Sequence, residues 1–321
     1  MIMSNKPIEK YITDFLDYLE IEKGLSNNTQ KNYKRFLNKF FNWLIENKLE
    51  KLTPVQISTD HIWKYRIFLS RHINQKLKKT LKKSSQNLYL ISLRSLFEFF
   101  LEKKIPSLSP TYIKLVKDKG DREIKFLNLS QIEKLLLAPN IKSKIGLRDR
   151  AIMEVFFSTG LRVEELVNLN YEQFKITNKT RDLELVIVGK GNRVRTVYIS
   201  ERAIGWLKKY LDVRRDMDKA LFINYWLPAK KLNLSRRLTV KSIDDIVKKY
   251  VKIAGLPIMA TPHTIRHSFA TDLLSQGVDL RMVQEFLGHK NIATTQIYTH
   301  VTNKQLKDIH KKIHSINRIK N

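Results

Sequence analysis

The chain of 321 residues is 42% apolar, enough for the cores of two domains, and it contains no cysteine, which excludes disulfides, thiolate catalysis and cysteine-ligated zinc and fits a cytoplasmic location. Its 60 Lys and Arg against 31 Asp and Glu give a net charge of +29, which indicates a polyanion such as nucleic acid; an anionic membrane surface and a lysine-favouring genome composition are the alternatives. The sequence has neither a run of about 18 apolar residues nor a signal-peptide core, so we expect a soluble protein without a membrane-spanning helix.

Residues 1–104 predict a basic bundle of helices. The second helix begins at a Ser/Asn cluster and repeats apolar residues at a spacing of three to four, which is typical of an amphipathic helix. The first is expected to end near Gly24 and the fourth to be capped by serine. The four predicted helices span residues 6–24, 26–48, 59–73 and 84–104. Four short helices make a small bundle.

Residues 105–124 carry two prolines, a glycine and a dense cluster of charges, which predicts an extended basic linker. A second domain, residues 125–321, should be mostly helical. Its exception is residues 181–200, where two β-rich runs flank the turn GKGN and predict a hairpin. The predicted helices of this domain span residues 130–139, 146–160, 201–218, 240–255, 262–276 and 279–287. The expected fold is mainly α, and two basic modules joined by a linker could close around a DNA duplex.

The stretch "TPHTIRHSFATDLLSQG", residues 261–277, opens a helix with unusual chemistry. Thr261 is a good N-cap, so His263 should lie in the first turn beside free backbone N–H groups, with Arg266 on nearly the same face. This combination suits a phosphate. A metal site made of His263 and His267 is disfavoured, because the glutamate that follows the first histidine in zinc proteases is missing and no third ligand is evident. A capped helix with surface polar groups is the remaining alternative.

The stretch "STGLRVEELVNLN" places an arginine where a helix is expected to start. Gly160 can end one helix, and Arg162 then begins the next, against the preference of helix N-termini for acidic residues. Glu165, three residues on, could orient Arg162; an ordinary surface ion pair is the alternative. Further along, Lys190 lies between two glycines at the hairpin tip, either directed toward a groove or as an incidental turn residue. No GK[ST] motif occurs, so ATP binding is not supported.

The stretch "FLGHKNIATTQIYTH" completes the set of candidates. Gly288 is expected to end a helix, His289 follows at once, and Tyr298 comes nine residues later. A tyrosine hydroxyl has a pKa near 10 and becomes a nucleophile only beside a base or cations. Taken alone, Tyr298 fits a packed aromatic residue equally well.

Together these elements resemble the tyrosine recombinase (phage-integrase-like) family, and most of all its bacterial and archaeal Xer site-specific recombinases. The order of "TGLRVEEL", "GKGN", "HTIRH", "LGH" and a later tyrosine is that of the family, and the resemblance runs through the whole chain. It implies an N-terminal four-helix core-binding (SAM-like) domain over residues 1–104. It also implies a mixed α/β, mostly helical catalytic domain over residues 125–321, with a small antiparallel hairpin and a C-terminal tail helix.

The resemblance implies a reaction that needs no metal and no cofactor. Tyr298 would attack the scissile phosphodiester and form a 3′-phosphotyrosyl link, while Lys190 protonates the leaving 5′-oxygen. His263 and His289 would donate hydrogen bonds to the phosphate or act as acid and base; some family members carry tryptophan at the latter position.

The remaining implied roles belong to residues that hold the phosphate. Arg162 and Arg266 would bind its non-bridging oxygens, and forked guanidinium groups match the charge that builds there. Glu165 would support Arg162. His267 drops out of the catalytic set and is expected to orient or pack against its neighbours.

The implied partner is double-stranded DNA with a specific recombination site, bound with strong dependence on salt. The protein would act as a tetramer on two duplexes, alone or with a second recombinase, possibly with a DNA translocase, and resolve chromosome dimers through a Holliday junction during chromosome partition and cell division. An integrase or resolvase of a mobile element is the alternative; a type IB topoisomerase and a non-catalytic DNA-binding protein fit less well. Four basic residues are expected to face DNA, or else to form a solvated helix face: Lys34, Lys82, Lys83 and Arg94.

Overall fold

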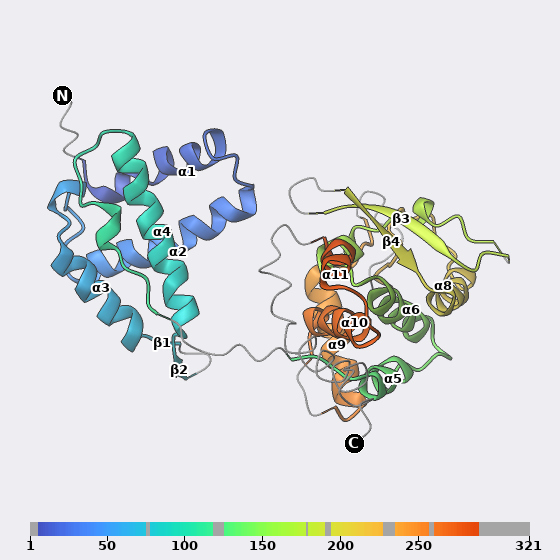
Figure 1. Cartoon of the computed structure of the whole chain (residues 1–321). Coiled ribbons are helices and arrows are strands. Elements are labelled where there is room, and N and C mark those ends of the chain that lie inside the picture. The colour runs from blue at the N-terminus through green and yellow to red at the C-terminus, as the bar shows by residue number, and fades with distance from the viewer. Residues whose placement is uncertain are drawn as a thin grey trace, which may run out of the picture. The chain divides into compact units, whose positions relative to one another are not determined.

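The computed structural model divides the chain into two compact units, Met1–Asp121 and Arg122–Asn321 (Figure 1). Both are mainly helical, which confirms the predicted fold class. No helix in the described part of the chain is long and apolar enough to cross a bilayer. The structure describes residues 6–74, 78–117, 125–177, 179–189, 194–226, 235–256 and 260–288.

The N-terminal unit contains the four expected helices, with a two-residue β-ladder between the third and the fourth (Figure 1). The predicted first helix begins as the 3₁₀ turn η1 (Ile8–Tyr11), and Gly24, with φ of 59°, lies just beyond its end. The helices and strands are α1 (Ile12–Ile21), α2 (Asn27–Glu46), α3 (Thr59–Arg71), β1 (Ile73–Asn74), β2 (Lys79–Thr80) and α4 (Lys83–Glu102).

The predicted serine cap of α4 is wrong. The helix begins at Lys83, with Lys82 at the N-cap position and no side-chain cap, so the serines lie inside the first turn. The Gln86 side chain instead donates to the carbonyl of Leu81, at 2.9 Å. This bond ties the first turn to the chain before it, which lets the helix start earlier than the serines suggest.

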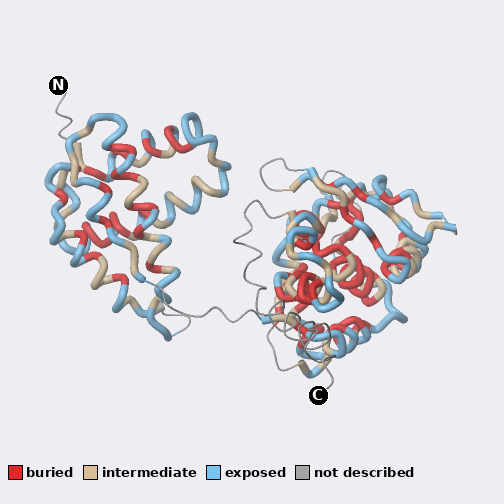
Figure 2. The backbone as a smooth tube through the Cα atoms, in the orientation of Figure 1, coloured by how far each residue is buried: buried red, intermediate tan, exposed pale blue. Residues whose placement is uncertain are grey.

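Aromatic rings fill the core of the N-terminal unit. Phe40 and Trp43 of α2 meet Tyr65 of α3, with ring centroids 4.9 and 5.4 Å from that ring, and such contacts add to the apolar area that each ring buries. Figure 2 shows buried positions alternating with exposed ones along these helices, as the amphipathic spacing of α2 predicted.

The described part of residues 105–124 packs on the N-terminal unit. Ile113 is fully buried there, and Asn87 of α4 exchanges two hydrogen bonds with the backbone of Val116, at 3.0 and 2.8 Å. The three-part division into residues 1–104, 105–124 and 125–321 stays a prediction.

In the described residues of the C-terminal unit, the other elements pack around the central helix α6 (Lys144–Thr159), and two strands pair as an antiparallel hairpin. The hairpin pairs Leu183 with Ile199 and Val188 with Val194, which confirms the predicted pair of strands. The elements are α5 (Leu129–Leu137), α6 (Lys144–Thr159), α7 (Val163–Val167), β3 (Leu183–Val188), β4 (Val194–Ile199), α8 (Glu201–Asp212), α9 (Val240–Ile253), α10 (Pro262–Ser275) and α11 (Leu280–Leu287).

Helix α8 is shorter than the 201–218 range predicted for it. It ends at Asp212, because the buried Arg214 pairs with Asp216 and donates to the carbonyls of Ala220 and Leu221, at 2.8 and 2.9 Å. These bonds hold the following residues in a turn rather than a helix.

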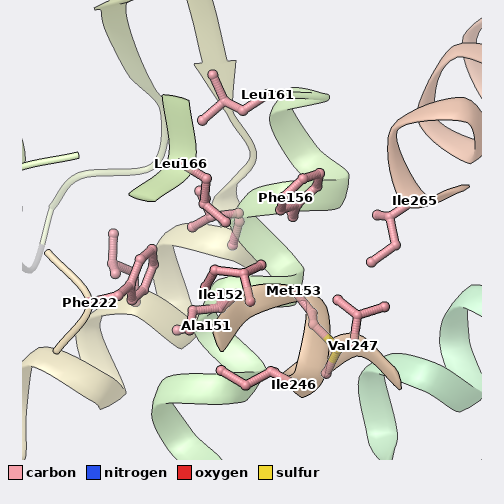
Figure 3. Packing of buried hydrophobic residues seen from close by; sticks show 14 of the residues in the cluster. Ala151, Ile152, Met153, Phe156, Leu161, Leu166, Phe222, Ile246, Val247 and Ile265 are labelled. Atoms are coloured by element: carbon pink, nitrogen blue, oxygen red, sulfur yellow. The ribbon is translucent and has the colours of Figure 1, made fainter. Parts of the chain in front are cut away.

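Helix α6 lies at the centre of the unit. Ile152, Met153 and Phe156 pack there against residues of α7, α9 and α10 (Figure 3). Because α6 is buried along most of its length, the position of its last residue, Thr159, is fixed by the core. The loop after α6 therefore leaves the core at a defined point, where the candidate site begins.

Candidate active site

The candidate site is built around the C-terminal end of α11. The last carbonyl groups of a helix have no partner within the helix and carry the negative end of its dipole, so they favour cations. Three arginines from separate elements donate to three consecutive carbonyl oxygens here: Arg195 to Phe286 at 3.2 Å, Arg266 to Leu287 at 2.6 Å and Arg162 to Gly288 at 2.9 Å.

Two glycines in the left-handed conformation shape the backbone of this site. Gly160 (φ 57°) ends α6, and Gly288 (φ 63°) ends α11, as their sequence positions predicted. The turn at Gly160 makes Arg162 the N-cap residue of α7, and the Gly160 carbonyl accepts a hydrogen bond from Arg266 at 2.6 Å. The two helix ends are thus joined through one buried guanidinium.

Glu165 lies against Arg162, as their spacing suggested. Its two carboxylate oxygens accept from the side chain and from the backbone N–H of Arg162, at 2.9 and 2.7 Å. The carboxylate compensates an arginine at a helix start, where a positive charge is otherwise unfavourable. The side chain of Arg162 remains 30% exposed, so it is accessible to a ligand.

Arg195 is a site residue that the sequence did not reveal. It lies on β4, and its side chain is only 10% exposed. Its guanidinium donates hydrogen bonds to both carboxylate oxygens of Glu165, at 2.9 and 2.6 Å. Burial alone would raise the pKa of Glu165, but the hydrogen bonds and charges of Arg195 and Arg162 lower it to about 2. Glu165 is therefore ionised throughout the physiological pH range.

Helix α10 carries two histidines, His263 and His267. It begins as predicted, with Thr261 as its N-cap and Pro262 in its first turn. The imidazole of His263 is exposed, yet partial desolvation and the positive charges of Arg266 and Arg162 lower its pKa. A phosphate bound between these groups would offset the effect of the charges, so the neutral imidazole of His263 would become a stronger base when an anion arrives.

Burial, His263 and Arg266 lower the pKa of His267 to about 4. The unfolded chain takes up a proton at this residue below about pH 6.5, whereas the folded protein does not, so the stability that neutral His267 contributes is lost as the pH falls from about 6.5 to 4, by at most ~1.4 kcal/mol per pH unit. Urea titrations of the wild type and of His267→Gln across this range should show a shallower decline for the variant. Equal slopes would contradict the neutral state of His267 in the folded protein.

Three predicted residues, Lys190, His289 and Tyr298, lie outside the described residues. The glycines that precede two of them are described, and both lie at the site. A Cβ atom added to Gly189 would lie 3.0 Å from Glu165 Oε1, and the Gly288 carbonyl accepts from Arg162. Arg162, Glu165, His263 and Arg266 thus come together in the C-terminal unit.

The four predicted DNA-facing residues belong to the N-terminal unit. Lys34 on α2, and Lys82 and Lys83 at the start of α4, are exposed. Arg94 differs, because it is half-buried and both its Nε, at 3.0 Å, and its Nη2 donate to the carbonyl of Ile113. Its guanidinium thus has an intramolecular partner, and DNA contact by any of the four stays a prediction.

Comparison with known proteins defines the class of protein. The model of the phage integrase family matches residues 125–305, and that of the phage integrase N-terminal SAM-like domain matches residues 12–104. The chain therefore belongs to the phage integrase family. The predicted enzyme class, a tyrosine recombinase of the Xer type that cuts and rejoins DNA, is confirmed with it.

The similar proteins carry Xer names. Tyrosine recombinase XerD of Pseudomonas putida is 34% identical over 304 residues, covering 94% of this chain and 96% of the relative. XerD of Lacticaseibacillus casei is 36% identical (94% and 98% covered), and XerC of Thermodesulfovibrio yellowstonii is 35% identical (96% and 97% covered). The fold is also that of the XerH site-specific recombinase bound to palindromic difH substrate, with a TM-score of 0.71 at 23% identity over 98% of each chain.

Proposed function

We propose that this recombinase binds double-stranded DNA at a specific site and exchanges strands through a 3′-phosphotyrosyl intermediate formed by Tyr298. The observation that carries the proposal is the set of arginines at the end of α11, directly before His289. Net charge of +29 supports a DNA partner, and the XerH structures similar to this chain hold DNA.

In the proposed reaction the Tyr298 oxygen attacks the scissile phosphorus, and the bond from phosphorus to the 5′-oxygen breaks. Lys190 gives a proton to the leaving oxygen, and His263 or His289 takes the phenolic proton. A 5′-hydroxyl of the partner strand then attacks the phosphotyrosine and gives its proton to Lys190, while the bond from phosphorus to the Tyr298 oxygen breaks and the histidine returns the phenolic proton. Each step exchanges one phosphate ester for another, so no nucleotide hydrolysis is needed.

Arg162 and Arg266 are proposed to bind the non-bridging oxygens. Both already lie within one cluster, held by the carbonyls of Leu287 and Gly288, so little rearrangement is required when a phosphate enters. Donors fixed in advance stabilise developing charge most effectively, because they cost no reorganisation during the reaction. Glu165 holds Arg162 in this arrangement.

The biological role that fits these features is the resolution of chromosome dimers through a Holliday junction, in the cytoplasm, during chromosome partition. We propose that the protein works as a tetramer on two duplexes, alone or with a second recombinase, and with a DNA translocase as a further partner. The Xer names of its relatives support this role over that of a mobile-element integrase.

A trapping experiment tests the proposed function. The Tyr298→Phe protein is first used to select the DNA sequence that it binds from a random-sequence library. A duplex of the selected sequence is then made with a nick beside the scissile phosphate, so that the cleaved fragment diffuses away and the covalent adduct accumulates. Wild-type protein should form an adduct that is stable in denaturing gels, whereas Tyr298→Phe should bind the same duplex and form none. An adduct from the variant, or none from the wild type, would overturn the assignment.

A further inference from the structure

The guanidinium of Arg195 is fully engaged within the protein. Its Nη1 and Nη2 atoms hold the two oxygens of Glu165, and its Nε atom donates to the Phe286 carbonyl at 3.2 Å. All three nitrogen atoms of this guanidinium thus have partners within the protein. Arg195 is therefore suited to holding other residues in place rather than to binding DNA.

Glu165 accepts hydrogen bonds from both Arg195 and Arg162. Each oxygen of Glu165 accepts one bond from Arg195 and one bond from Arg162, the latter through Nη1 and through the backbone N–H. If Arg195 were absent, Glu165 would be free to form a two-bond fork with the Arg162 side chain alone. That fork would turn the guanidinium of Arg162 toward the carboxylate and away from a bound phosphate.

Arg195 also joins segments that are far apart in the sequence. It lies opposite Ile187 in the β3–β4 ladder, and Ile187 is two residues before Gly189. The hydrogen bond from Arg195 to the Phe286 carbonyl reaches the end of α11. The Gly288 backbone passes so close that an added Cβ atom would lie 2.8 Å from the Arg195 side chain. One side chain thus fixes the hairpin, Glu165 and the end of α11 against one another.

We propose that Arg195 is a positioning residue for DNA cleavage, which sets the orientation of Arg162 on the scissile phosphate by holding Glu165 and the end of α11. This inference rests on the proposed function, since it needs Arg162 to contact the phosphate. In this role Arg195 would act through Glu165 and Arg162, without itself contacting the DNA or the reacting atoms. Its loss should slow cleavage on the order of 10–100-fold, the effect typical of losing an outer hydrogen-bond partner of a functional group.

A change in the substrate separates this role from a general effect on folding. A methylphosphonate at the scissile position replaces one charged non-bridging oxygen with a methyl group. An arginine that neutralises this oxygen is then needed less, so the defect of Arg162→Ala should shrink. If Arg195 acts through Arg162, the defect of Arg195→Gln should shrink as well, whereas a defect caused by misfolding would be the same on both substrates.

The experiment measures single-turnover adduct formation on nicked phosphate and methylphosphonate duplexes. Arg195→Gln and Arg195→Lys should both be slow on phosphate, because a lysine reaches one acceptor and cannot reproduce the fork. On methylphosphonate, both variants should approach the rate of the wild-type protein on the same substrate. If the glutamine variant does not fold, the lysine variant provides the test. Arg214→Gln is the matched control: its side chain is 5% exposed, against 10% for Arg195, and it also holds a carboxylate, that of Asp216, in a fork. This variant should be less stable, with no change in the ratio of the two rates.

A double-variant cycle gives a second, independent result. In an Arg162→Ala background, adding Arg195→Gln should slow cleavage less than about threefold, since the residue that it positions is gone. If the two defects were fully additive, or if Arg195→Gln cleaved at the wild-type rate, the positioning role of Arg195 would be overturned. The proposed function would still stand as long as the wild-type protein forms the adduct. Absence of any adduct from the wild type would instead overturn the proposed function.

Discussion

Replacing Arg266 with alanine should slow formation of the phosphotyrosyl adduct by about 10²–10³-fold, the usual cost of removing one fixed donor from a developing anion. Arg266 is 5% exposed, so its charge acts where water screens it little. Arg266→Lys should recover only part of the rate, because an ammonium cannot donate to the Gly160 and Leu287 carbonyls and to a phosphate in the same planar geometry. Single-turnover cleavage measured at saturating protein isolates this step from DNA binding.

The matched control for Arg266 is Arg214. It is also buried and also donates to backbone carbonyls, those of Asp218, Ala220 and Leu221. Arg214→Ala should lower the free energy of unfolding, because buried acceptors lose their donor, but it should leave the rate of adduct formation within about threefold of wild type. Equal cleavage rates for Arg266→Ala and Arg214→Ala would show that Arg266 only stabilises the fold.

Replacing Gly160 with alanine should lower the free energy of unfolding by about 2–4 kcal/mol. Two costs add: a side chain at φ of 57° is strained, and the new Cβ atom would lie 2.4 Å from Cδ1 of Phe269. The Phe269 ring would have to move, and the Gly160 carbonyl that accepts from Arg266 would move with the backbone. Urea titration should therefore show reduced stability, and single-turnover cleavage should be slower.

Gly205→Ala provides the contrast for Gly160→Ala. Gly205 lies within α8, and nothing would lie within 4 Å of an added Cβ atom. Alanine is favoured over glycine inside a helix, so this variant should gain roughly 0.5–1 kcal/mol of stability and cleave DNA at the wild-type rate. A Gly160→Ala protein as stable as the wild type would contradict the close packing of Phe269 on the turn.

The features that the sequence predicted well are those set by local chemistry. Thr261 caps α10, Gly160 and Gly288 end their helices, and the two strands that flank GKGN pair with each other, because each feature depends on residues within a few positions. The pairing of Arg162 with Glu165 belongs to the same group. Membership of the phage integrase family also followed from the order of such local motifs.

What the sequence did not predict depends on contacts between distant residues. Arg195 meets Glu165 across 30 positions and Phe286 across 91, and the alternation of a short strand does not indicate such partners. Arg94 looked like part of an exposed helix face, but its guanidinium is held by the carbonyl of Ile113, which lies in the stretch expected to be an extended linker. Both cases concern charged side chains whose partners are supplied by the tertiary fold.

The hydrogen bonds from three arginines to the end of α11 restrict insertions and deletions within this helix. An insertion or deletion of one residue within α11 would turn its last carbonyls by about 100° and shift them by about 1.5 Å. Arg162, Arg195 and Arg266 come from three different elements, so no single adjustment of the backbone could follow all three acceptors. The number of residues in α11 is therefore as much a requirement of the site as the identity of any arginine, whereas exposed loops elsewhere remain open to insertions.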